Sequence, residues 1–180
     1  MALTTYVSGE VLTAASLNAN FTFAAANGGK IGQVVSTTLT TTFTRASATY
    51  GDITGLTVSI TPTLATSTIF VVANVSVGTN LAAGHFFGQL ARGGTGIGVA
   101  TSVSSRVATS QQTTSVSSGQ TTPWSMSFLD SPSSTSALTY SVQCLSAGAA
   151  TVYVNRSVTD SDNANYARAV STITVFEVLA

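Results

Sequence analysis

The sequence contains few of the side chains on which catalysis depends. Of its 180 residues, six are basic and six are acidic, and it has one histidine, one cysteine and one lysine. Catalysis needs several titratable, metal-ligating or nucleophilic groups close together. This scarcity predicts a protein that is not an enzyme and that holds no cofactor and no metal ion.

The reactive residue types that occur once cannot form their usual sites. His85 has no second imidazole with which to share a metal, and Cys144 has no partner for an intrachain disulfide or a cysteine-rich zinc site. Cys144 lies on the apolar side of the alternating segment 138–144, which predicts a buried structural thiol. A catalytic triad would have to recruit Asp52 or Asp130, and the G-x-S-x-G motif that exposes a serine nucleophile is missing. We therefore expect His85 to be structural or on the surface.

The closest pair of carboxylates, Asp160 and Asp162, lies in the polar segment 160–166. Oxygens of Asp and Asn suit a calcium ion, but Ala164 stands at the fifth position, where the EF-hand loop needs Asp or Asn. We expect a solvated loop here, with a cation site as the alternative. The glycines of 92–98 lack the Lys-Ser/Thr of a phosphate-binding loop and predict a hairpin turn instead.

The low charge indicates an assembly. Charged residues make up 7% of this chain, against roughly 25% in average globular proteins, and the net charge is zero. Because little like-charge repulsion keeps copies apart, we expect much of the surface to face other subunits; a monomer covered by its 25 serines and 31 threonines is the alternative. The scattered arginines form no basic stripe for nucleic acid, and no apolar run is long enough to span a membrane.

The chain divides near residue 30. In the first part, an N-terminal arm over residues 1–30, the segment 11–21 has helical character. Thr13 is placed to cap a short helix, and Leu17 and Phe21 are four residues apart on one face. Asn27-Gly28-Gly29 ends it. A helix this short must pack on its own domain, on sister subunits or on a larger partner.

The second part, residues 31–180, is written in short alternating strands separated by turns. The pattern predicts eight to ten strands in an all-β sandwich of the jelly-roll-like type. The Ser/Thr-rich segment 101–122 allows two interpretations, a long exposed loop or polar strands, and the sequence does not decide between them. The five tyrosines and Trp124 fit a core or a subunit interface, with a sugar-binding surface as the alternative.

Two sets of segments resemble known proteins. Residues 6–21, YVSGEVLTAASLNANF, resemble the N-terminal segment of many structural proteins of tailed bacteriophages, tail fibres above all. A second set of segments resembles a β-rich module of phage virion proteins, including those of cyanobacterial phages. The set comprises residues 128–132, 140–143, 152–157 and 171–177. These motifs are shared by tail fibres, head decorations and other virion proteins.

The resemblance implies a virion protein that assembles as a homotrimer. In this hypothesis Leu12, Leu17 and Phe21 attach the arm to the particle. We expect a short tail fibre or receptor-binding module that contacts other virion proteins and a host-surface glycan. Because no repeats or shaft follow the arm, a capsid decoration protein, a cement that stabilises the head, is the alternative. A free carbohydrate-binding domain is the alternative outside the virion.

Overall fold

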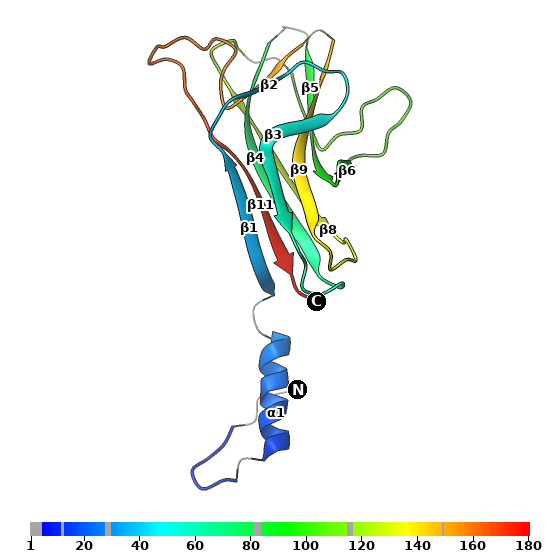
Figure 1. Ribbon diagram of the computed structural model, residues 1–180, viewed down its shortest axis with the longest axis vertical. Helices are drawn as coiled ribbons and strands as arrows, with labels where there is room; N and C mark the ends of the chain where they lie inside the picture. The colour runs from blue at the N-terminus through cyan, green and yellow to red at the C-terminus, as the bar shows by residue number, and fades with distance from the viewer. Residues whose placement is uncertain (1–4, 12, 28–29, 81–83, 115–116, 149) are drawn as a thin grey trace.

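The chain folds into one helix followed by two packed β-sheets (Figure 1). The computed structural model describes residues 5–11, 13–27, 30–80, 84–114, 117–148 and 150–180, without the side chains of residues 23–27. Helix α1 spans Ala14–Asn27. The strands in these described ranges are β1 Ile31–Leu39, β2 Phe43–Arg45, β3 Gly51–Ile60, β4 Thr68–Thr79, β5 His85–Arg92, β6 Thr95–Ile97, β7 Gln111–Thr114, β8 Thr122–Asp130, β9 Leu138–Ala147, β10 Val152–Val154 and β11 Ser171–Val178.

All strand pairs are antiparallel. Sheet A has six strands and sheet B has five, and in each sheet two strands follow one another along one edge of a neighbour, so that each sheet is four strands across. In sheet A, β4 pairs with β8 along one edge and with β11 along the other, and β1 pairs with the far edge of β11. Beyond the end of β11, β10 pairs with the same edge of β4, and β2 pairs with β10. In sheet B the order is β3-β9-β5, and β6 and β7 pair with opposite ends of β5. The order β1-β11-β4-β8 packed on β3-β9-β5-β6/β7 is that of a jelly roll. The predicted all-β sandwich is confirmed.

The core lies between the sheets and follows the alternation of apolar residues in the strands. Successive side chains of a strand point to opposite faces, so that every second residue can be buried. In β3, Leu56, Val58 and Ile60 are buried and alternate with exposed residues. In β4 every second residue from Ile69 to Val77 is apolar, and all of these are buried: Ile69, Val71, Ala73, Val75 and Val77.

The predicted hairpin after β5 is present, but its second strand is shorter than expected. Gly93 and Gly94 take positive φ angles of 55° and 82°, which a two-residue hairpin turn needs. The sequence predicts a return over 97–100, whereas β6 ends at Ile97. Gly98, with a φ of 59°, lies just after this strand, and a Cβ on it would be 2.7 Å from the Phe128 ring. In the part of the open segment 101–122 that the structure describes, which leaves out residues 115 and 116, β7 and the first residue of β8 are the only strand residues.

A tight contact between Trp124 and Gly88 joins the two sheets. The Trp124 side chain, on β8 of sheet A, is fully buried, and Gly88 lies on β5 of sheet B. A Cβ at Gly88 would lie 2.6 Å from the indole ring. Glycine at this position therefore lets the largest core side chain reach the opposite sheet.

We expect Gly88→Ala to lower the free energy of unfolding by about 1–3 kcal/mol, because the added methyl overpacks the core against the indole. In the double variant Gly88→Ala/Trp124→Phe the smaller ring makes room for the added methyl. The loss of unfolding free energy in the double variant should therefore be smaller than the sum of the losses in the two single variants. Urea denaturation followed by far-ultraviolet circular dichroism measures the free energy of unfolding in every variant, because Trp124 is the only tryptophan of the sequence and the double variant lacks it. Simple additivity of the two substitutions would contradict this account.

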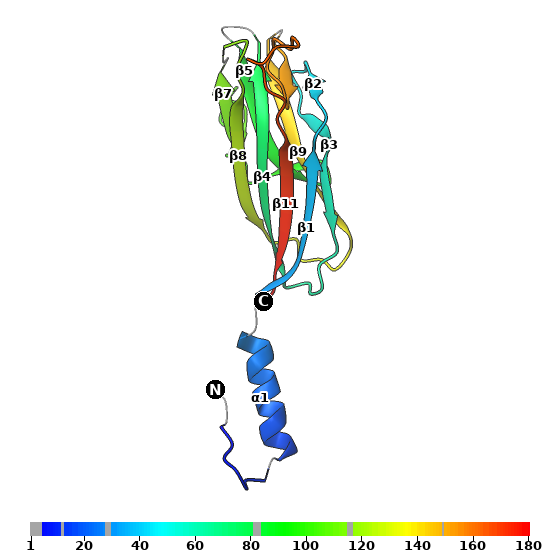
Figure 2. The same ribbon diagram turned by 90° about the vertical axis from the view of Figure 1, so that its left-hand side faces the viewer.

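Helix α1 begins where the sequence predicts its cap. The Ser16 amide donates to Thr13 Oγ1 at 3.2 Å, which satisfies one free N–H of the first turn. The last helical residue is Asn27, and Gly28 and Gly29 lie outside the described residues. Figures 1 and 2 show α1 beyond the end of the sandwich where β1 begins and β11 ends. The division into an arm over 1–30 and a domain over 31–180 stays a prediction.

No helix in the described part of the chain is long and apolar enough to cross a membrane.

Candidate functional site

The reactive side chains that the sequence singles out are spread over the sandwich, and Cys144 and Asp52 have structural roles there. Cys144 is fully buried, as predicted, and burial raises the pKa of its thiol to about 12, against a smaller opposite effect of Arg45. His85 lies exposed at the start of β5. Asp52 accepts hydrogen bonds from Ser141 Oγ at 2.8 Å and Gln143 Nε2 at 3.0 Å. These contacts tie β3 to β9.

Asp130 joins the two sheets at the end nearest α1. It ends β8 of sheet A and is buried, and its Oδ2 accepts from Arg92 Nη1 at 2.6 Å and from the Tyr140 hydroxyl at 2.7 Å, both on sheet B. Burial, reinforced by the bond to Asp130, raises the pKa of Tyr140. The tyrosine stays neutral and donates to the carboxylate, so this cluster is a clamp between sheets.

A second buried carboxylate, Glu177 of β11, holds the same end together. Thr63 donates to its Oε1 through both its amide (2.6 Å) and its hydroxyl (2.7 Å), and Gln33 Nε2 donates to Oε2 at 2.7 Å. Gln33 Nε2 also donates to the Thr61 carbonyl at 2.7 Å. Burial by itself raises the pKa of Glu177, but the hydrogen bonds from Gln33 and Thr63 outweigh it and lower the pKa to about 2.

This lowered pKa makes stability fall in acid. The ordinary pKa of Glu177 is 4.5, so its stabilisation is complete above about pH 4.5 and is lost as the pH falls through the folded-state value of about 2. We expect Glu177→Gln to cost about 1–3 kcal/mol at pH 7, because the new NH₂ group faces the Gln33 donor.

The measurement is the free energy of unfolding in urea from pH 2 to pH 7. The variant should be less stable at pH 7 and should lose part of the wild-type acid dependence. The matched control is Asp162→Asn, which removes a carboxylate from a loop residue that is exposed. An unchanged pH profile in Glu177→Gln would contradict the assignment.

The arm residues predicted for attachment are not brought onto the sandwich. Leu12 lies outside the described residues. Leu17 is half-buried, and Phe21 remains 64% exposed on the same helix. Val7 and Val11, before the helix, are exposed as well. The described part of the arm thus presents apolar side chains that its own domain does not cover.

The outer face of sheet A carries apolar side chains that sequence reasoning missed. In strand register, Leu129 of β8 pairs with Phe70 of β4, which pairs with Phe176 of β11, which pairs with Val34 of β1. We call these four residues the apolar row. Leu129 and Val34 are each 52% exposed, and the rings of Phe70 and Phe176 lie 6.1 Å apart. The alternation of side chains along each strand places these four residues outward. Only the pairing register of the strands brings them into one row across the sheet.

Next to the apolar row, the outer face of sheet A is covered by hydroxyl and amide groups. Ser36 and Thr174 share a hydrogen bond of 2.8 Å across β1 and β11, and Ser125 donates to Asn74 at 3.0 Å across β8 and β4. The two rows that follow the apolar row contain no charged residue: Ser127, Val72, Thr174 and Ser36, then Ser125, Asn74, Thr172 and Thr38. A partner can therefore cover these three rows without desolvating a charge.

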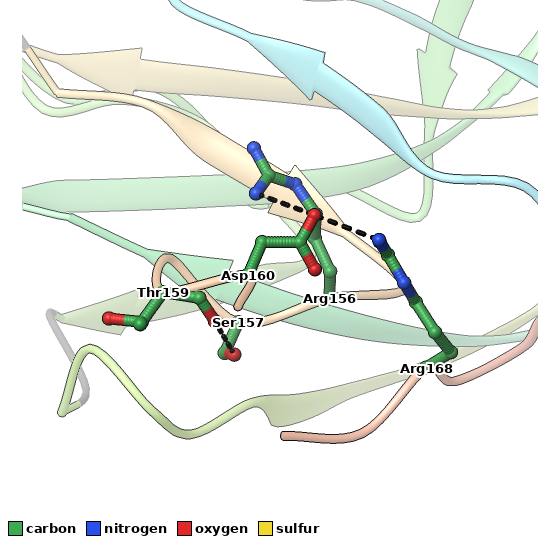
Figure 3. A network of polar contacts seen from close by, with 5 residues as sticks. All are labelled: Arg156, Ser157, Thr159, Asp160 and Arg168. Atoms are coloured by element: carbon green, nitrogen blue, oxygen red, sulfur yellow. Dashed lines mark hydrogen bonds and ion pairs between the residues drawn. The ribbon is translucent and has the colours of Figure 1, made fainter. Parts of the chain in front are cut away.

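At the opposite end from α1, the loop after β10 encloses a network of charges (Figure 3). Asp160 Oδ2 is bound by Arg156 Nη1 at 3.3 Å and by Arg168 Nη2 at 2.9 Å. The Arg156 guanidinium also lies over the Tyr153 ring, 4.3 Å from its centroid. The two guanidiniums at the Asp160 carboxylate would repel a cation bound beside Asp162. Among the described residues, no group of three or more His, Cys, Asp or Glu is placed to hold a metal ion.

Together these features define a jelly-roll domain with a projecting helical arm. Neither models of protein families nor curated proteins match the chain. The chain is similar to a structure of the Gx strain of infectious bursal disease virus, with a TM-score of 0.43 and 11% identity over 82% of this chain and 37% of that chain. For the VP2 subviral particle of the same virus, the TM-score is 0.36 and the identity 10%, over the same shares. The chain spans 37% of the length of each of these two proteins.

Proposed function

We propose that the chain is a non-enzymatic structural subunit of a tailed-bacteriophage particle, a short tail-fibre or receptor-binding module that assembles as a homotrimer. The observation that carries the proposal is the arm, whose Phe21 is 64% exposed on a helix extending beyond the sandwich. The resemblance of residues 6–21 to the attachment segments of such proteins supports it.

In this proposal the arm binds the particle through the apolar side of α1. A helix of 14 residues is marginal by itself in water, so burial of Leu17 and Phe21 on another protein would stabilise both the helix and the attachment. The jelly roll then projects with the loops after β10 facing outward, because these lie at the end opposite α1.

Self-association, in the same proposal, uses the outer face of sheet A. A second copy is the partner that matches this face: both the apolar row and the hydroxyl rows are uncharged, and the chain as a whole has 12 charged residues in 180. Any partner with an ordinary density of surface charge would have to bury charges there without ionic partners, which costs several kcal/mol.

The attachment is tested with Phe21→Asp in particles assembled with the variant protein. We expect the jelly roll to fold as in the wild type and at least a tenfold loss of the protein from purified particles, because a carboxylate replaces the exposed apolar contact. Ala15→Asp is the control: it adds the same charge at an exposed position on the opposite side of α1 and should incorporate normally. Wild-type levels of Phe21→Asp in the particles would overturn the role of the arm.

The self-association is tested by light scattering on the purified protein after gel filtration. We expect a wild-type mass of three 18.2 kDa chains, and a shift to the single-chain mass in Leu129→Glu, which places a charge in the apolar row. Thr57→Glu, an exposed position of β3 in sheet B, is the control and should stay assembled. A wild-type protein that is a monomer at all concentrations would overturn the proposed trimer.

The alternative location is the capsid surface, as a decoration protein. The arm supports this role as well, because the exposed apolar side of α1 can bind a protein of the shell as readily as a protein of the tail. Electron microscopy of particles carrying a labelled chain separates the two roles, since label on the tail supports the appendage and label on the shell supports the decoration protein.

A further inference from the structure

A polar cavity lies in the loop between β10 and β11, away from α1 and from the outer face of sheet A. Its volume is about 300 Å³, and Ser161, Asp162, Asn163, Tyr166 and Arg168 line it together with Asp160. Residues that carry carboxylate, amide, hydroxyl and guanidinium groups line this open space, which is large enough for a small molecule. The cavity belongs to neither of the surfaces to which the proposed function assigns a role.

The walls of this cavity are anchored to the sandwich. Arg156 and Arg168 form an antiparallel β-bridge across the base of the loop, and both guanidiniums hold Asp160 (Figure 3). Ser157 is buried and donates to the Thr159 carbonyl at 2.6 Å, and the Thr159 amide donates to Ser118 on a neighbouring loop at 2.8 Å. A site anchored in this way loses little conformational entropy when it binds a ligand.

Tyr166 is fixed by packing as well as by its backbone. Gly119 lies against its ring, since a Cβ on Gly119 would be 3.1 Å from the ring edge. The Tyr166 amide donates to the Asn163 carbonyl at 3.0 Å, and Asn163 Oδ1 accepts from the Asn165 amide at 2.9 Å. The half-buried ring therefore forms a rigid wall of the cavity beside the polar groups.

The charged groups around the cavity select the class of ligand. Asp160, Asp162 and Arg168 line it, and the guanidinium of Arg156, which is not among the lining residues, reaches the Asp160 carboxylate. An anion would meet the Asp162 carboxylate, and a cation would meet the guanidinium of Arg168. A neutral ligand that both donates and accepts hydrogen bonds satisfies the two kinds of group at once.

We propose that this cavity binds a neutral sugar residue of a glycan. Neighbouring sugar hydroxyls can donate to the Asp162 carboxylate and accept from the Arg168 guanidinium or the Asn163 amide, and the C–H face of the sugar ring can pack on Tyr166. The site consists of these four residues, and its ligand class does not depend on what α1 binds.

The test measures binding of the full purified chain to free methyl glycosides of glucose, galactose, mannose, N-acetylglucosamine and rhamnose by saturation-transfer NMR, and to an array of immobilised neutral, sialylated and sulfated glycans. We expect the wild type to bind at least one neutral sugar. Tyr166→Ala should weaken that binding about tenfold through loss of the aromatic wall. Asp162→Asn, at an exposed position, should weaken it in a chain whose folding is unaffected.

Gln112→Ala is the matched control, because Gln112 lines a separate cavity with His85 and Phe87 on sheet B. It should bind the same sugar as tightly as the wild type. The proposal is overturned if no neutral glycan binds, if only the sialylated or sulfated glycans bind, or if Asp162→Asn and Tyr166→Ala bind as the wild type does. Sugar binding by a chain that is absent from virus particles would refute the proposed attachment and leave the sugar site standing.

Discussion

Strand β4 is the element on which the rest of the structure depends. It pairs with β8 along one edge and with β11 and then β10 along the other, so every strand of sheet A is placed by its register with β4 or with a partner of β4. Its inward residues are apolar from Ile69 to Val77. Because the side-chain period of a strand is two, a slip of one residue would turn all of them to the solvent, and this burial therefore fixes the register of both neighbours.

The scarcity of charge has a structural consequence. Five of the six acidic residues have partners within the chain: Glu10 in the arm, and Asp52, Asp130, Asp160 and Glu177 in the sandwich. Asp130 and Glu177 are buried and hold the end of the sandwich near α1, where the loop before β4 and the strands of both sheets meet. With these carboxylates turned to internal partners, the outer face of sheet A is left to hydroxyl, amide and apolar side chains.

The two ends of the molecule are built for different contacts. The end near α1 has apolar residues without cover on the helix and the apolar row of sheet A, and its polar groups are paired inside. The far end has loops, an anchored network of opposite charges and a polar cavity. This separation agrees with a subunit that is attached at one end and exposed at the other.

Alternation of apolar residues determined the fold class, because a half-buried strand must place every second side chain inward. The sequence was therefore enough to predict strands β3 and β4, the capped start of α1 and the buried Cys144. What only the tertiary structure decided depends on register and on contacts distant in sequence. Leu129, Phe70, Phe176 and Val34 each occur at an outward position, but pairing across four strands aligns them. The conformation of the loop after β10 decided the surroundings of Asp160. The sequence predicts a solvated loop there, with a cation site as the alternative, and the structure places the guanidiniums of Arg156 and Arg168 on the Asp160 carboxylate, where opposite charges attract.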